Sequence, residues 1–169
     1  LGTLVAGIAL AIDVKDRTNA GIWVGGVLVV EFLPAVLVGL TLGPLVDRLE
    51  RRTLMVGADL LRAAVFCTLP FTGSAGQIVA LAFVAGLASG FFRPAVYAGV
   101  PNLVPEQELA DANALLQTVE NASWAIGPLV GGVVTAATSP DVTYWINAAS
   151  FLLSAVLVAR IPARLLQSA

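Results

Sequence analysis

Long apolar segments that contain almost no charge are the feature that most constrains what this chain can fold into. They follow one another along the sequence and are separated by short polar turns. A helix needs about 20 residues to cross the hydrocarbon core of a bilayer, and most of these segments reach that length. They are rich in Gly and Ala and show no polar–apolar alternation, so no strand pattern competes. An all-α membrane protein is therefore expected.

The composition excludes an ordinary soluble domain. Of 169 residues, 58% are hydrophobic and 12% are charged, and the mean hydropathy is +0.90. Soluble domains carry roughly 45–50% apolar and about 25% charged residues. The net charge of −2 gives no basic face for nucleic acid. With one cysteine, Cys67, and no histidine, no disulfide, metal site, cofactor or enzyme activity is expected.

A bundle of six membrane helices is predicted as one domain over residues 1–169, at about 1–14, 20–46, 53–71, 75–93, 105–137 and 142–161. The first looks truncated, because its apolar run is shorter than a span. The longest loop is expected at 94–111, with a helix start at Pro105. Lys15 and Arg17 fall in the first loop, whereas six arginines share the opposite side: Arg48, Arg51, Arg52, Arg93, Arg160 and Arg164. The positive-inside rule then predicts a multi-pass protein of the inner (cytoplasmic) membrane with both ends in the cytoplasm.

The turn after the second predicted helix has the order Gly-x-x-x-Asp-Arg-x-x-Arg-Arg. This order resembles the signature between helices two and three of the major facilitator superfamily. The resemblance assigns close helix contact to the Gly and a conformation-locking charge network to the charged residues. The matching positions are Gly43, Asp47, Arg48, Arg51 and Arg52; Glu50 stands where the family often has a second Gly. The alternative is a loop whose charges only fix the topology.

Three more charged residues are expected to belong to this cytoplasmic gate. Asp59 and Arg62 lie three residues apart on one predicted helix, so they share a face and can pair. Charges inside a bilayer are costly without a partner, and Arg93 is expected to join them. The hypothesis is that Asp47, Asp59, Arg62 and Arg93 form a latch that stabilises the outward-open state. Charges that only fix the topology remain the alternative here too.

A polar stripe runs along the fifth predicted helix. Its members recur at spacings of three and four residues, with Asn121 on the flank: Asn113, Gln117, Glu120, Trp124, Gly127 and Gly131. Such a stripe is expected to face the bundle interior or a watery cavity. It runs into a Gly-Pro-x-x-Gly-Gly segment that resembles the antiporter signature of drug/proton exporters in the same superfamily. The matching residues are Gly127, Pro128, Gly131 and Gly132, with Ser123 where another Gly is expected; a merely kinked packing helix is the alternative.

Two acids lie deep in predicted helices. Glu31 is roughly 15 Å from the outer end of the second helix, and Glu120 is about 12 Å from the inner end of the fifth, at 1.5 Å per residue. Removal from water favours the protonated form of a carboxyl group. One of the two is therefore expected to carry a coupling proton, with Glu120 favoured and Glu31 open to binding a cationic substrate. A structural, silent acid is the alternative.

Aromatic and small residues carry further expectations. Trp23, Tyr144 and Trp145 lie near outer helix ends and suit an interfacial aromatic belt, whereas Trp124 is deeper and could stack on a substrate or simply pack. Small residues four apart are spaced for close helix contact at Gly21/Gly25, Gly39/Gly43, Gly86/Gly90 and Gly127/Gly131.

The segment Phe91–Gly132 as a whole resembles the branch of the superfamily that includes the enterobactin exporter and macrolide efflux proteins. The resemblance implies the N-terminal six-helix half of a twelve-helix transporter working by alternating access. It further implies proton-coupled efflux of small amphipathic molecules, drug- or siderophore-like. The expected partners are the bilayer, a missing C-terminal half, the substrate and protons. A lysophospholipid transporter and a non-transporting sensor or scaffold remain the alternatives.

Overall fold

The computed structural model describes residues 2–41 and 49–166, and within these ranges the chain is helical with no strand. The helices are α1 (Gly2–Thr18), α2 (Gly21–Thr41), α4 (Arg51–Thr68), α5 (Ala75–Gly99), α6 (Leu109–Ala137) and α7 (Pro140–Ala159). Short 3-10 turns follow at η1 (Leu69–Phe71), η2 (Val100–Asn102), η3 (Glu106–Glu108) and η4 (Ala163–Leu165). The all-α prediction is confirmed. Gly43, Asp47 and Arg48 of the expected gate lie outside the described residues.

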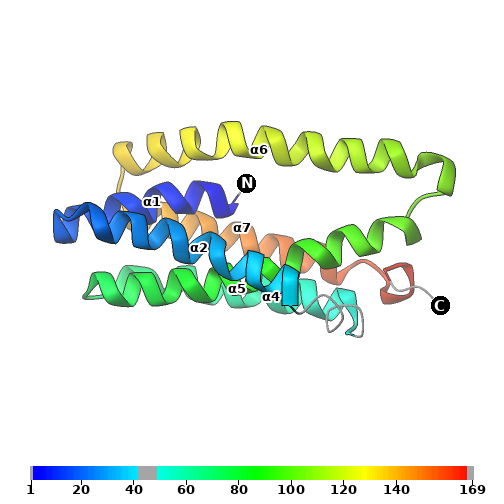
Figure 1. Ribbon diagram of the computed structural model, residues 1–169, viewed down its shortest axis with the longest axis horizontal. Helices are drawn as coiled ribbons and strands as arrows, with labels where there is room; N and C mark the ends of the chain where they lie inside the picture. Colours follow the sequence, from blue (N-terminus) through cyan, green and yellow to red (C-terminus); the bar gives the residue numbers. More distant parts are fainter. Residues whose placement is uncertain (1, 42–48, 167–169) are drawn as a thin grey trace.

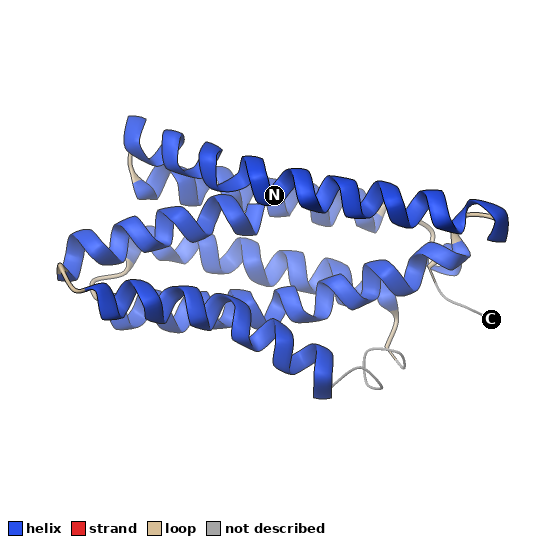
Figure 2. Ribbon diagram, turned by 45° about the horizontal axis from the view of Figure 1, so that its top comes forward, coloured by secondary structure: helices blue, strands red, loops and turns tan. Residues whose placement is uncertain are grey.

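The helices lie side by side with their long axes roughly aligned (Figures 1 and 2). Helix α5 packs on α2 and α4, α4 also packs on α7, and α1 lies between α2, α6 and α7. The core at these contacts is made of buried side chains from α1, α2, α4, α5 and α7, among them Leu10, Val27, Phe66, Ile78, Tyr144 and Phe151. Helix α6 lies along one side of the bundle and packs mainly on α1 (Figure 1).

Local sequence signals set two of the helix starts. Ser74 caps α5: its hydroxyl accepts from the Gln77 backbone N–H at 3.4 Å, and the Gln77 side chain accepts from the Ser74 N–H at 3.2 Å. This reciprocal capping box satisfies two N–H groups that the helix leaves free. Ser139 caps α7 by accepting from the Val142 N–H at 3.3 Å, and Pro140 occupies the first helical position.

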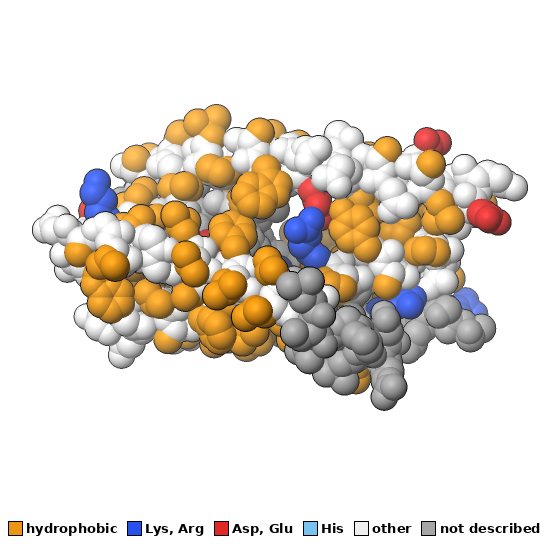
Figure 3. Space-filling view, in the orientation of Figure 1, with side chains coloured by type: hydrophobic (Ala, Val, Ile, Leu, Met, Phe, Trp, Pro, Cys, Tyr) orange, Lys and Arg blue, Asp and Glu red, His pale blue; other side chains and the backbone are white. Residues whose placement is uncertain are grey.

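Four helical segments are long and apolar enough to cross a membrane: Gly21–Gly39, Arg51–Phe71, Ala75–Asn102 and Pro140–Ala159. Hydrophobic side chains cover much of the face drawn in Figure 3, and charged ones are few. Helices α1 and α6 are outside this set. The last turns of α1 carry Asp13, Lys15, Asp16 and Arg17, and α6 carries the polar stripe.

Three predicted boundaries differ from the structure. Helix α5 continues through Pro94 to Gly99 instead of ending near Arg93, because Ala95 is fully buried against Met55 and Val158. This packing outweighs the usual tendency of a helix to end before proline. Helix α1 extends to Thr18, so Lys15 and Arg17 lie in its last turn and not in a loop. At Pro105 the chain enters the 3-10 turn η3, and the α-helix begins only at Leu109.

Two of the four predicted glycine pairs, Gly86/Gly90 and Gly127/Gly131, contain glycines that lie close to the backbone of a neighbouring helix. A Cβ on Gly86 would lie 2.6 Å from the Glu31 carbonyl oxygen, and one on Gly90 would lie 2.9 Å from the Ala35 Cα. These glycines therefore let α5 approach the backbone of α2. In α6, Gly131 lies against the Val5 backbone of α1. A Cβ on Gly21, Gly25 or Gly39 would meet nothing within 4 Å in the described residues, so these sites make no such contact there.

Candidate functional site

A groove of about 400 Å³ lies between α2 and α5. Its size falls within the roughly 300–1,000 Å³ typical of small-molecule sites. The close approach of the two backbones at Gly90 forms part of its floor. Its walls are apolar except for three polar side chains of α5. The lining residues are Phe32, Ala35, Val36, Ser89, Gly90, Arg93, Pro94 and Tyr97.

An ion pair joins this groove to α6. The Arg93 guanidinium donates to the Glu120 carboxylate at 2.7 Å, and the two side chains are partly exposed, at 61% and 27%. The sequence grouped Arg93 with Asp59 and Arg62, but the structure gives it Glu120 as its partner. The difference arises because the pair joins two helices, a contact that spacing along one helix does not reveal. Protonation of Glu120 would remove its charge and weaken the bond to Arg93.

Asp59 and Arg62 form the expected pair in α4, and both side chains are buried. The Arg62 guanidinium lies over the Phe92 ring at 4.5 Å and the Phe151 ring at 4.4 Å from the ring centroids. A cation between two aromatic faces is stabilised by their quadrupoles. Because Phe92 belongs to α5 and Phe151 to α7, the Asp59–Arg62 ion pair links α4 to both of these helices. Its part in a gate stays a prediction.

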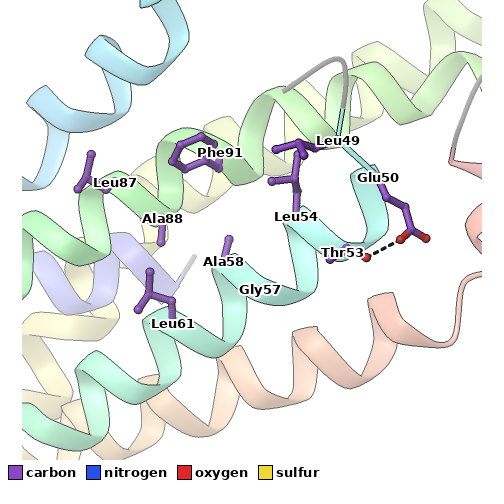
Figure 4. A pocket seen from close by; sticks show the side chains of 10 residues that line it. All are labelled: Leu49, Glu50, Thr53, Leu54, Gly57, Ala58, Leu61, Leu87, Ala88 and Phe91. Atoms are coloured by element: carbon purple, nitrogen blue, oxygen red, sulfur yellow. Dashed lines mark hydrogen bonds between the residues drawn. The ribbon is translucent and has the colours of Figure 1, made fainter. Parts of the chain in front are cut away.

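The described arginines of the loop motif bind backbone carbonyls. Arg51 donates to the Leu166 carbonyl oxygen at 2.8 Å, and Arg52 donates to that of Ala159. Both bonds tie the start of α4 to the chain that follows α7. Beside them, a groove of about 560 Å³ runs between α4 and α5 (Figure 4). It is lined by Leu54, Leu61, Leu87 and Phe91 among others, and Thr53 and Glu50 bond to each other at 2.6 Å.

The predicted polar stripe of α6 divides into two parts. Its glycines Gly127 and Gly131 are buried, with Gly131 against α1. Its polar members Asn113, Gln117 and Asn121 are exposed, and the Gln117 amide donates to Asn121 at 3.1 Å. The predicted orientation of the stripe toward the bundle interior is therefore correct only for its two glycines. The exposed part presents a polar surface that the described bundle does not cover.

Two members of the candidate set lie next to this exposed part. Trp124 is 52% exposed and stacks on Phe32 with a centroid distance of 5.6 Å. Pro128 lies one turn further along α6 and borders a second, smaller cavity with Trp124. Gly132, the last residue of the antiporter-like motif, has only an ordinary contact with Ile8, which a Cβ would meet at 3.8 Å.

Glu31 is the more deeply buried of the two acids considered for proton coupling, at 3% exposed. Its Oε2 has no hydrogen-bond partner in the part of the chain that the structure describes. The carboxyl group faces Gly7 of α1, where an added Cβ would lie 2.8 Å from Oε2. It also borders the smaller cavity, of about 140 Å³, between α1, α2 and α6.

A hydrogen-bond network centred on buried Asp13, near the C-terminal end of α1, was not predicted from the sequence. Asp13 accepts from Arg17 Nε at 2.6 Å and from the Tyr144 hydroxyl at 2.9 Å, and Arg17 also donates to the Thr72 carbonyl at 2.6 Å. Tyr144 is fully buried, so its expected place in an interfacial belt is wrong. The spacing of four between Asp13 and Arg17 could have predicted their pairing. Nothing local in the sequence links them to Tyr144.

Comparison with known proteins gives a family match over almost the whole chain. Residues 2–165 match the sequence profile described as Major Facilitator Superfamily. The chain is 32% identical to the uncharacterized MFS-type transporter YfiS of Bacillus subtilis over 130 residues, which are 77% of this chain and 31% of that protein. It is 25% identical to macrolide efflux protein A of Streptococcus pyogenes over 162 residues (92% and 40%). It is 31% identical to the multidrug efflux pump Tap of Mycolicibacterium fortuitum over 137 residues (75% and 33%). The aligned part of the chain thus spans 31 to 40% of the length of these curated relatives.

Proposed function

Because the chain belongs to the major facilitator superfamily, whose members are transporters and not enzymes, we propose that it is part of a membrane exporter of small amphipathic molecules. The substrate class is drug- or siderophore-like, and export is coupled to protons by alternating access. Two relatives are named for efflux, one of macrolides and one of multiple drugs, which supports this direction. The observation that carries the proposal is the Arg93–Glu120 pair beside the α2–α5 groove.

The pair supplies a simple coupling step. With Glu120 ionised, its carboxylate holds Arg93 and ties α6 to the groove. A proton on Glu120 cancels the charge, releases Arg93 and lets α6 move relative to α5. Helix α6 has few contacts with α5 apart from this pair, so α6 can move relative to α5 together with α1, on which it packs. Protonation thus biases one of two arrangements, which is what a coupled transporter requires.

The proposed architecture is the N-terminal half of a twelve-helix transporter in the inner membrane. Helices α1 and α6 join the four candidate spans to make six, and both chain ends lie in the cytoplasm. The arginine distribution supports this orientation. The exposed polar part of α6 then faces the second half, which closes the substrate path. The motif at Gly43, Asp47 and Arg48, with Asp59 and Arg62, acts as the cytoplasmic gate.

Ethidium uptake into inverted membrane vesicles that contain the transporter with both halves tests the proposal. Uptake is expected under an imposed proton gradient and is expected to fall to background with Glu120→Gln. Glu108→Gln is the matched control, because Glu108 lies in the exposed turn before α6. Unchanged uptake by Glu120→Gln at equal membrane abundance would contradict the proton assignment. If correctly inserted protein moved no member of a broad substrate panel, a sensor or scaffold role would replace the exporter.

A further inference from the structure

Two grooves flank the outer face of α4 and meet near its N-terminal end. The first is the groove of about 560 Å³ between α4 and α5 (Figure 4). The second, of about 390 Å³, lies between α4 and the end of α7 at Ala159. Glu50, Thr53 and Gly57 line both grooves, so the two spaces adjoin over this stretch of the chain.

This face of α4 is turned toward lipid. Leu60 and Leu61 on it are 49% and 45% exposed, and Arg51–Phe71 is one of the candidate membrane spans. Among the described residues α4 packs on α5 and α7, whereas α6 lies along the opposite side of the bundle (Figure 1). A second transporter half that faces α6 therefore lies away from both grooves. Exposed apolar side chains on this side of a spanning helix contact acyl chains.

The lining of the grooves changes from polar to apolar along α4. Its polar end has Glu50, Arg52 and Thr53, at the start of the candidate span or directly before it. Beyond Thr53 the walls are apolar for about 12 Å, at 1.5 Å per residue. They are formed by Leu54, Leu61, Leu87 and Phe91 in the first groove (Figure 4) and by Val56 and Leu60 in the second. A polar rim at the membrane surface beside two apolar channels matches a phospholipid, which has one head group and two acyl chains.

Gly57 leaves a low crossing between the two grooves. It is exposed, and a Cβ at this position would meet nothing within 4 Å. Because Gly57 has no side chain, no ridge separates the first groove from the second here. A lipid can therefore lie across α4 with one chain on each side of the helix.

The charge at this end of the bundle favours an anionic head group. Residues 49–54 and 159–166 carry Arg51, Arg52, Arg160 and Arg164 against Glu50 alone, four positive charges against one negative, so their net charge is +3. Arginines next to the cytoplasmic end of a membrane span attract the anionic lipids of that leaflet.

Arg52 and Glu50 provide a donor and an acceptor in the second groove. The Arg52 guanidinium donates to the Ala159 carbonyl oxygen, and no ion pair joins it to Glu50 within residues 2–41 and 49–166. A guanidinium has several N–H donors, so Arg52 can bind a phosphate and keep this bond. The Glu50 carboxylate accepts from the Thr53 hydroxyl at 2.6 Å and has further lone pairs. The phosphate and the free hydroxyls of a phosphoglycerol head group match these two side chains.

We propose that the two grooves bind one molecule of phosphatidylglycerol from the cytoplasmic leaflet. Its phosphate contacts Arg52, its head-group hydroxyls donate to Glu50, and its acyl chains lie on either side of α4. The bound lipid fills the space between α4 and its two neighbours and stabilises this end of the bundle. This inference rests on the proposed cytoplasmic orientation of the site and is independent of the export cycle.

Native mass spectrometry of the transporter with both halves, purified in detergent, tests the site. The protein is titrated with the dioleoyl forms of phosphatidylglycerol, phosphatidylethanolamine and phosphatidylcholine, which share their acyl chains, and the first bound lipid gives each Kd. Phosphatidylglycerol is expected to bind about fivefold more tightly than the other two. Arg52→Gln is expected to raise its Kd about fivefold and to leave that of phosphatidylethanolamine within about twofold. Arg52→Lys, which keeps the charge, is expected to retain most of the affinity.

A second pair of variants tests the crossing between the grooves. Gly57→Phe fills it and is expected to raise the Kd of phosphatidylglycerol about threefold. Gly76→Phe is the matched control, because Gly76 is exposed in the first turn of α5, away from both grooves, and a Cβ there also meets nothing within 4 Å. The melting temperature of each variant without added lipid shows whether it is folded. Added phosphatidylglycerol is expected to raise the melting temperature of the unmodified protein more than that of Arg52→Gln.

Three outcomes would overturn the proposal. They are equal Kd values for the three lipids, tighter binding of phosphatidylethanolamine than of phosphatidylglycerol, and an unchanged Kd of phosphatidylglycerol in both Arg52→Gln and Gly57→Phe. Lipid binding is measured without a proton gradient, so its failure is distinguishable from a failure of export. Loss of drug uptake with selective lipid binding intact would remove the export proposal and leave the lipid site standing.

Discussion

The phenol of Tyr144 in α7 donates a 2.9 Å hydrogen bond to the carboxylate of Asp13 in α1, across 131 residues of sequence. Asp13 is 6% exposed, so its charge must be satisfied inside the bundle. Arg17 donates to both oxygens of this carboxylate, at 2.6 and 3.3 Å, and its third guanidinium nitrogen donates to the Thr72 carbonyl in the turn between α4 and α5. Three separate parts of the chain therefore meet at one carboxylate.

Tyr144→Phe is expected to destabilise the protein by about 1–3 kcal/mol, because it removes the shorter of the two hydrogen bonds to Oδ2 of a buried carboxylate and leaves that oxygen only the Arg17 bond at 3.3 Å. The melting temperature of the purified protein in detergent, followed by tryptophan fluorescence, would fall by a few degrees. Tyr97→Phe is the control, because the Tyr97 hydroxyl makes no hydrogen bond in the described residues. Equal melting temperatures of Tyr144→Phe and unmodified protein would show that the bond contributes nothing.

The Arg93–Glu120 pair is expected to contribute little to stability. Arg93 is 61% exposed in the pair, and exposed pairs give about 0.2–1 kcal/mol. A double-mutant cycle with Arg93→Gln and Glu120→Gln, measured by unfolding in detergent, should give a coupling energy in that range. Export, in contrast, should be lost in both single variants. A coupling energy of about 3 kcal/mol or more would mark the pair as structural and weaken its assignment to proton coupling.

The sequence predicts those parts of this fold that depend on local chemistry. Apolar length predicts four of the six expected spans, and the spacing of Asp59 and Arg62 predicts their pair, because both signals lie within one helix. The expectation that a helix ends before proline is wrong at Pro94, because burial of Ala95 outweighs the local tendency of the chain to end the helix.

Partners across helices could not be predicted in the same way. Arg93 finds Glu120, and Tyr144 finds Asp13, because the packing of α1, α5, α6 and α7 brings their helices together. No periodicity in one segment encodes these distances. Glu31 illustrates the same limit. Its depth follows from its position in an apolar run, but only the structure shows that its Oε2 has no hydrogen-bond partner among the described residues and that Gly7 and Trp124 lie around it.

Gly86→Ala is expected to separate α2 from α5. Its Cβ would lie 2.6 Å from the Glu31 carbonyl oxygen and 2.8 Å from that of Val30, and rigid backbone cannot move aside cheaply. Overpacking of this kind costs about 1–3 kcal/mol. Gly76→Ala, on the same helix, meets nothing within 4 Å and should be neutral or slightly stabilising. Thermal unfolding of the two variants side by side gives the comparison, and equal stability would mean that α2 and α5 are not in close contact.

The buried Asp59–Arg62 pair gives the sharpest stability prediction. Arg62→Met leaves Asp59, which is 1% exposed, without its counter-charge, and removal of one partner of a buried pair costs about 3–5 kcal/mol. Asp59→Asn combined with Arg62→Met removes both charges, while the Met side chain can still pack between Phe92 and Phe151. The double variant should therefore recover most of the stability lost in the single one, as measured by unfolding in detergent. If export then fails in the stable double variant, the pair has a role in the transport cycle; if export is normal, its role is packing alone. A double variant no more stable than Arg62→Met would contradict the argument, because it would place the loss in the missing cation–π contacts and not in the uncompensated charge.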